Sequence, residues 1–291
     1  MTFESSVLVK EARSSMKGSV WFLEIIKNTL FLIIFSIIAD TSFYIVIEDM
    51  LNIKEEVHIS ILYLCWQIFV IVLCVLVAHF IQHRTLGFKF KRAIFHYLRG
   101  CITGFGMIAA AVFVGVITKV FTFHGLSNWM NVRLILLFFG GYVIQGMAEE
   151  VLCRGFIMLS IVRKNKVWLA IAFSSLIFAL MHISNTGFGL LPMINLFLFA
   201  VFEAIYLLET DNIWGISAIH TAWNFTQGCV FGLSVSGEEL MPSVFRVSCN
   251  DAAILSGGQF GPEGGLVVTL ILVCSLAMLL YKQKSQNIKV A

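Results

Sequence analysis

Six polar side chains interrupt hydrophobic segments that are long enough to cross a membrane, where an ionisable residue is costly and therefore indicates function. They form three groups with helical spacing, Glu-Glu-x-x-x-Arg, Phe-x-x-x-His and His-x-x-x-Asn. Residues three or four positions apart share one face of a helix. Each group can thus present its polar atoms on one stripe, and we interpret the three as one buried catalytic site. The six residues are Glu149, Glu150, Arg154, His182, His220 and Asn224.

The two adjacent glutamates could do different chemistry. Glu150 precedes Arg154 by four residues, the order that favours an ion pair on a helix, so we expect a structural pair that supports the site. Glu149 then remains without a cationic partner. A desolvated carboxylate of this kind suits a general base that takes a proton from water.

The other groups could position that water. His182 and His220 could orient it, stabilise a developing oxyanion or hold a metal, and the amide of Asn224 is a suitable oxyanion donor. His182, His220 and Glu149 would also form the ligand set of a hydrolytic zinc with one position open for water. Because asparagine is a poor zinc ligand and a single carboxylate is free, we favour chemistry without a cofactor.

A helix bundle in a membrane must position these side chains. The chain of 291 residues is 59% hydrophobic and 13% charged, whereas soluble domains carry about 25% charged residues. We predict an all-α fold, a polytopic bundle of about eight transmembrane helices with the site among the fourth, fifth and seventh. The predicted spans are 24–47, 59–81, 101–121, 132–152, 167–185, 190–208, 213–233 and 265–281.

The helical rise brings the catalytic residues to one depth. Counted from the basic turn at 163–166 at ~1.5 Å per residue, Glu149 lies on the order of 20 Å away and His182 about 25 Å. Counted from the turn near residue 211, His220 lies at roughly 13 Å and Asn224 at about 19 Å. We therefore expect Glu149, His182, His220 and Asn224 near the middle of the membrane.

Basic residues gather in segments 82–100 and 163–166 and in both tails, whereas the intervening loops are acidic or neutral. This distribution predicts a multi-pass protein of a cell membrane, with both termini in the cytoplasm. Segment 82–100 has the composition of an interfacial helix. The glycine-rich stretch 234–264 is expected to cap the bundle outside the cytoplasm.

One catalytic unit accounts for the second half of the chain. We assign transmembrane helices and the basic cytoplasmic segment to residues 1–131, a catalytic helical core to 132–281 and a cytoplasmic tail to 282–291. No linker of the kind that separates soluble modules interrupts these parts.

The three motifs resemble the signatures of a known family. They read EEVLCRGF from Glu149, FALMH ending at His182, and HTAWN from His220. Their order and spacing are similar to those of the CPBP intramembrane proteases, which include type II CAAX prenyl endopeptidases and bacteriocin-processing and immunity proteins. The resemblance covers residues from about 132 to 281. It implies a glutamate-dependent or metallo-endopeptidase of a bacterial plasma membrane, in which Glu149 activates water and His182, His220 and Asn224 complete the site.

The expected function is hydrolysis of a peptide bond in a membrane-embedded or lipidated peptide, which would reach the site from the cytoplasmic half or laterally. The alternative is a non-catalytic immunity or scaffold protein of the same fold that binds a peptide or a membrane-protein partner in the bilayer. The complete motifs favour the enzyme. A proton-relay transporter would also bury ionisable residues, but it predicts repeats that the sequence does not contain. Nothing in the composition indicates nucleic-acid binding.

Overall fold

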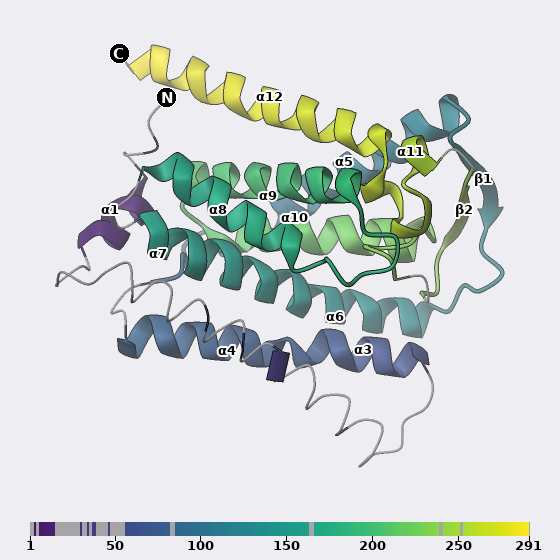
Figure 1. Cartoon of the computed structure of the whole chain (residues 1–291), viewed down its shortest axis with the longest axis horizontal. Helices are drawn as coiled ribbons and strands as arrows, with labels where there is room; N and C mark the ends of the chain where they lie inside the picture. The colour runs from purple at the N-terminus through teal and green to yellow at the C-terminus, as the bar shows by residue number, and fades with distance from the viewer. Residues whose placement is uncertain are drawn as a thin grey trace.

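The computed structural model describes residues 3, 6–14, 30, 34, 37, 38, 46, 56–81, 85–162, 166–238, 241–250 and 253–290. The described chain is largely helical, and its long helices lie roughly side by side in an elongated bundle (Figure 1). Five helical segments are long and apolar enough to cross a membrane, which makes the chain a multi-pass membrane protein. They are Val57–Phe80, Ala93–Ile117, Val132–Val162, Leu190–Thr210 and Leu266–Ser285.

The described residues form the following elements along the chain, and π-helical turns stand at the ends of some of the helices. In order, they are α1 (Val7–Ser14), α3 (Glu56–Trp66), α4 (Ile68–Leu76), α5 (Ala93–Ile117), β1 (Phe121–Leu126), α6 (Val132–Glu150), α7 (Leu159–Val162), α8 (Val167–Leu180), α9 (Leu190–Thr210), α10 (Ile213–Phe225), β2 (Phe245–Cys249), α11 (Ala253–Ser256) and α12 (Leu266–Val290). The π-helical turns are Val77–Ile81, Val151–Met158 and Thr226–Val230. Two 3₁₀ turns, Gly258–Phe260 and Pro262–Gly264, precede α12.

Several predicted spans differ from the observed helices. Span 24–47 lies almost wholly outside the described residues. Helix α5 begins at Ala93, so the prediction of a separate interfacial helix over 82–100 is wrong for its last eight residues. The apolar side chains Ile94, Phe95 and Leu98 continue the outer surface of α5, which explains why the helix does not break before residue 101.

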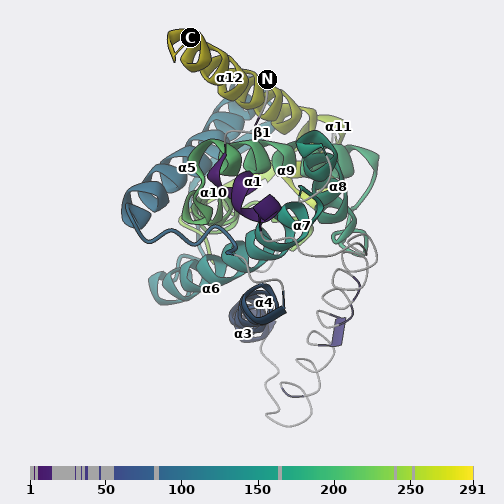
Figure 2. The same cartoon turned by 90° about the vertical axis from the view of Figure 1, so that its left-hand side faces the viewer.

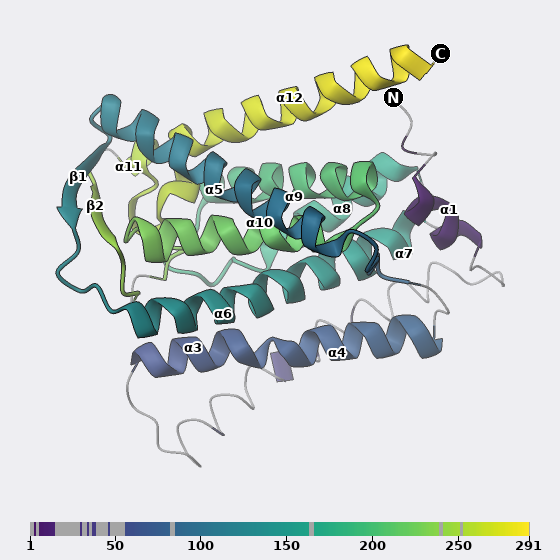
Figure 3. The same ribbon diagram turned by 180° about the vertical axis from the view of Figure 1, so that it is seen from behind.

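Helix α10 lies inside the bundle against α5, α6 and α9 (Figure 3). It is not among the segments that are apolar enough to span a membrane by composition, because polar residues such as His220, Thr221 and Asn224 interrupt it. Two glycines of α5 allow the close contact with α10. A Cβ at Gly100 would collide with the carbonyl oxygen of Gly215, and a Cβ at Gly104 with that of Ile219. This small-residue spacing is typical of tightly packed membrane helices and fixes α10 at the position of His220.

A two-stranded antiparallel sheet, which the sequence did not predict, closes one end of the largely helical bundle (Figure 1). The register is Phe121↔Cys249, Thr122↔Ser248, Phe123↔Val247 and Leu126↔Phe245, with a bulge between Phe123 and Leu126. Strand β2 belongs to the stretch 234–264, which covers this same end together with α11 and the two 3₁₀ turns.

The short helix α1 covers the opposite end (Figure 2). The carboxylate of Asp211, which follows α9, accepts hydrogen bonds from Ser6 Oγ at 2.6 Å and from the backbone N–H groups of Val7 and Leu8 at 3.0 and 3.1 Å. These bonds satisfy the first turn of α1 and hold its buried apolar face on the bundle.

Candidate active site

A cavity of about 500 Å³ lies between the α3–α4 segment, α6, α8, α9 and α10, and residues of the 234–264 stretch complete its wall. Its lining includes Glu149, His182, His220 and Asn224. The structure therefore brings the four predicted catalytic residues to one cavity. Glu150 and Arg154 do not line it and lie behind it, fully buried.

The imidazole of His220 lies between the two adjacent glutamates. Its Nδ1–H donates to Oε1 of Glu150 at 2.9 Å, and its Nε2 lies 3.7 Å from Oε2 of Glu149. The rings of Phe178 and Phe199 stand edge-on to the imidazole, with ring centroids 5.9 and 5.6 Å away. Glu150 and the two phenylalanines thus hold the imidazole with Nε2 directed at Glu149.

Behind the cavity, Arg154 bridges two buried carboxylates. Its Nη1 lies 2.9 Å from Glu150 Oε1, and its Nη2 lies 2.9 Å from Glu203 Oε2 on α9. All three side chains are fully buried, and the guanidinium stacks on the ring of Phe178 at 4.4 Å. The ion pair between Glu150 and Arg154 is the one that the sequence predicts. Glu203 belongs to none of the three motifs, and its only signal in the sequence is a carboxylate inside an apolar span.

The π-helical turn Val151–Met158 follows the two glutamates directly and contains Arg154. Such turns widen a helix by one residue and occur frequently at functional sites. Beyond it, the helix continues to Val162 and is longer than the predicted span 132–152.

Gln145 connects two of the predicted residues. Its Nε2 donates to Oε1 of Glu149, and its Oε1 accepts from Nδ2 of Asn224 at 3.0 Å. Sequence reasoning did not include Gln145 in the site. The available signal is its position, one helical turn before Glu149 on α6.

His182 lies in the turn after α8, which ends at Leu180 and is shorter than the predicted span 167–185. Its Nδ1–H donates to the backbone carbonyl of Phe178 at 2.9 Å, so Nε2 is the ring nitrogen left for the cavity. The chain then passes through Gly187 at φ +75°, a backbone conformation that favours glycine, before α9 begins at Leu190.

Glu263 holds the 234–264 stretch over the cavity. Its Oε1 accepts from Trp223 Nε1 on α10 at 2.8 Å, and its Oε2 accepts from the backbone N–H and the hydroxyl of Ser236, each at 2.8 Å. Asn195 on α9 donates to the Glu263 carbonyl at 2.7 Å. Glu263 itself lines the cavity, a role that the sequence did not indicate.

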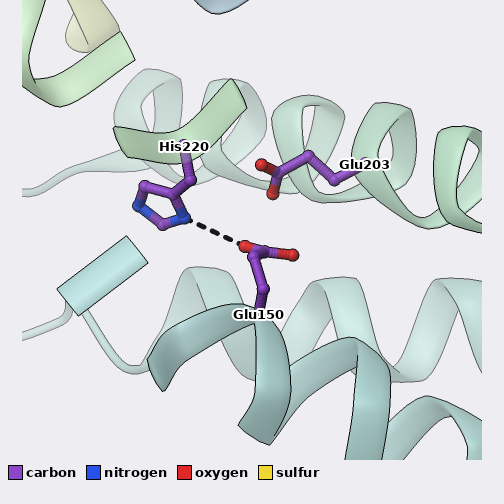
Figure 4. Close-up of side chains that lie close together, drawn as sticks. All are labelled: Glu150, Glu203 and His220. Atoms are coloured by element: carbon purple, nitrogen blue, oxygen red, sulfur yellow. Dashed lines mark hydrogen bonds and ion pairs between the residues drawn. The ribbon is translucent and has the colours of Figure 1, made fainter. Parts of the chain in front are cut away.

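One group of described residues, Glu150, Glu203 and His220, places potential metal-ligand atoms within 4.8 Å of one another (Figure 4). It differs from the zinc set predicted from the sequence, because Glu149 and His182 are not part of it. The two carboxylates point toward each other and already bind the guanidinium of Arg154. A metal ion here would lie beside a fixed positive charge and would compete for the same oxygens, so this group does not fit a metal site.

Residues 131–226 match the family model described as type II CAAX prenyl endopeptidase Rce1-like. This segment contains all three motifs, and the family prediction is confirmed. No curated protein and no solved structure matches the chain.

Proposed function

We propose that this chain, which belongs to the CPBP/CAAX protease family through residues 131–226, is an intramembrane endopeptidase. It would hydrolyse a peptide bond of a membrane-embedded or lipidated peptide or protein. The observation that carries the proposal is the pair formed by Glu149 Oε2 and His220 Nε2 on the cavity wall. The two atoms lie 3.7 Å apart, and Oε2 accepts no hydrogen bond from the described residues.

This spacing is longer than a hydrogen bond and leaves both atoms available to one water molecule. In the proposed reaction, Glu149 takes one proton of that water while Nε2 of His220 accepts a hydrogen bond from the other. The water oxygen attacks the peptide carbonyl carbon. Glu149 then returns its proton to the departing amide nitrogen as the C–N bond breaks, which yields one carboxyl and one amino product.

The tetrahedral intermediate carries negative charge on the former carbonyl oxygen. Asn224 uses one hydrogen of its amide nitrogen for Gln145, so the second hydrogen can donate to this oxyanion. His182 lines the same cavity, and its Nε2 is the ring nitrogen left to contact the bound peptide. Removal of one such donor lowers kcat by roughly 10²- to 10³-fold in other hydrolases.

The test uses purified protein in liposomes with a library of lipidated and unlipidated hydrophobic peptides, with products identified by mass spectrometry. We expect cleavage by the wild type and none by Glu149→Gln or His220→Gln. His124→Gln is the matched control, because His124 lies exposed on β1 and bonds only Ser248 among the contacts of the described residues. Equal product formation by a folded Glu149→Gln variant would contradict the assignment and favour the non-catalytic alternative.

A further inference from the structure

The amide groups of Gln145 and Asn224 and the carboxylate of Glu149 form one chain of hydrogen bonds along the cavity wall. A carboxylate can only accept, so the NH₂ group of Gln145 must face Glu149 and its carbonyl oxygen must face Asn224. That oxygen can in turn only accept, so the NH₂ group of Asn224 must face Gln145. The orientation of both amides therefore follows from the charge on Glu149.

Close packing of α6 on α10 gives this chain its geometry. Gly146, the residue after Gln145, leaves room for Thr221: a Cβ at Gly146 would lie 3.0 Å from the backbone nitrogen and 3.0 Å from Oγ1 of Thr221. The Thr221 hydroxyl shares its hydrogen between the carbonyl of Ser217 on its own helix, at 2.8 Å, and the carbonyl of Tyr142 on α6, at 3.1 Å. The two helices are thus fixed to each other one turn away from the bond between Gln145 and Asn224.

The bond from Gln145 also determines which oxygen of Glu149 is reactive. Oε1 accepts from Gln145, whereas Oε2 faces His220 Nε2. Without this bond, the carboxylate could rotate away from the imidazole, and the Asn224 amide could present its oxygen to the cavity. A carbonyl oxygen at that place would repel the developing oxyanion.

We infer that Gln145 is a positioning residue of the peptidase reaction, an assignment that rests on the proposed function. It holds Oε2 of Glu149 toward the water site and keeps an N–H of Asn224 available to the oxyanion. Gln145 lies outside the three motifs that mark the family in this sequence.

Kinetic variants test the role. Gln145→Met keeps the length of the side chain and removes both hydrogen bonds. We expect kcat to fall on the order of 10²-fold, the effect of a small misplacement of catalytic groups, while KM changes less than about twofold.

Gln145→Glu keeps the acceptor for Asn224 but donates to Glu149 only when protonated, so the optimum of kcat should move to lower pH. Gln283→Met on α12, a buried glutamine outside the cavity, is the control and should behave as the wild type. A kcat for Gln145→Met equal to that of the wild type would overturn the inference.

A stability cycle separates this inference from the proposed function. Thermal unfolding is compared for Gln145→Met, Asn224→Leu and the double variant. Because the two side chains are bonded, the double variant should lose less Tm than the sum of the single losses. Additive losses of Tm would show that Gln145 and Asn224 do not interact, which would overturn the inference whether or not the wild type cleaves a peptide. Non-additive losses in a protein that cleaves none of the peptides would overturn the proposed function, and with it the role of Gln145 in the reaction.

Discussion

Glu150 accepts the Nδ1–H of His220 while the same oxygen, Oε1, binds Nη1 of Arg154, each at 2.9 Å. One carboxylate oxygen on α6 thus connects a buried ion pair to the imidazole at the cavity. The arrangement fixes the orientation of His220 without placing Glu150 in contact with the cavity. It also explains why an adjacent pair of glutamates is useful on this helix, since consecutive residues point in directions about 100° apart.

Glu150→Gln should lower kcat, because an amide oxygen is a weaker acceptor for Nδ1–H and the ring of His220 loses its fixed orientation. We expect a loss on the order of 10²-fold, the lower limit for removal of acid–base assistance. The measurement is kcat in detergent or liposomes at equal amounts of folded protein. Glu209→Gln provides a control, since its partner Lys282 is 43% exposed and such pairs contribute at most about 1 kcal/mol.

Arg154→Met should destabilise the protein far more than Glu203→Gln. The first substitution leaves two buried carboxylates without a cation, and removal of one partner from a buried ion pair costs about 3–5 kcal/mol. The second retains the pair between Arg154 and Glu150, and the amide oxygen of the new glutamine can still accept from Nη2 of Arg154, so we expect a loss of about 1 kcal/mol. Thermal unfolding in detergent measures both. Equal losses of Tm would show that the contact between Arg154 and Glu203 contributes as much to stability as the two ion pairs of Arg154 together.

Gly104→Ala should reduce both stability and activity, because the added methyl group would collide with the carbonyl of Ile219, next to His220. Overpacking of this kind costs about 1–3 kcal/mol and would displace α10. Gly106→Ala on the same helix is the matched control, since a Cβ there meets nothing within 4 Å. That variant should be as stable as the wild type or slightly more stable, by about 0.5–1 kcal/mol. Similar behaviour of the two variants would mean that α5 does not position α10.

The sequence could predict the motif residues because each motif occupies only a few consecutive residues. A spacing of four residues places Glu150 beside Arg154 and His220 beside Asn224 whatever the tertiary structure. The contacts of Glu203 and Gln145 depend on which faces of α9, α6 and α10 meet, and no local pattern contains this information.

The sheet was missed for a similar reason. Strands β1 and β2 have six and five residues and lie far apart in the chain, so neither shows a pattern long enough to predict pairing. Hydropathy did predict a span over 213–233, but it could not show that α10 packs against α5, α6 and α9 inside the bundle, since that depends on which helix faces meet. Helices that carry a site in a membrane bundle are those for which hydropathy is least informative.

Chelation should leave peptide cleavage unchanged. Among the described residues, suitable ligand atoms gather at Glu150, Glu203 and His220, but Arg154 already binds the two carboxylates and compensates their charge. The proposed reaction uses Glu149 directly. Activity is measured after dialysis against a strong zinc chelator, with metal content determined on the same sample. A known zinc protease treated in parallel shows that the treatment removes catalytic zinc. Activity lost on chelation and restored by zinc would replace the glutamate mechanism with a metal-assisted one.

The cavity reaches the end of the bundle that carries β1 and β2, where the exposed residues Glu238 and Thr186 line it. The basic segments predict that this end faces away from the cytoplasm, which disagrees with access from the cytoplasmic half. In a cysteine-free background, a cysteine introduced at Glu238 should therefore react with a membrane-impermeant thiol reagent added outside intact cells. A cysteine introduced at Lys10 on α1, at the opposite end, should react only after the membrane is permeabilised. The reverse pattern would place the cavity rim in the cytoplasm and restore access from that side.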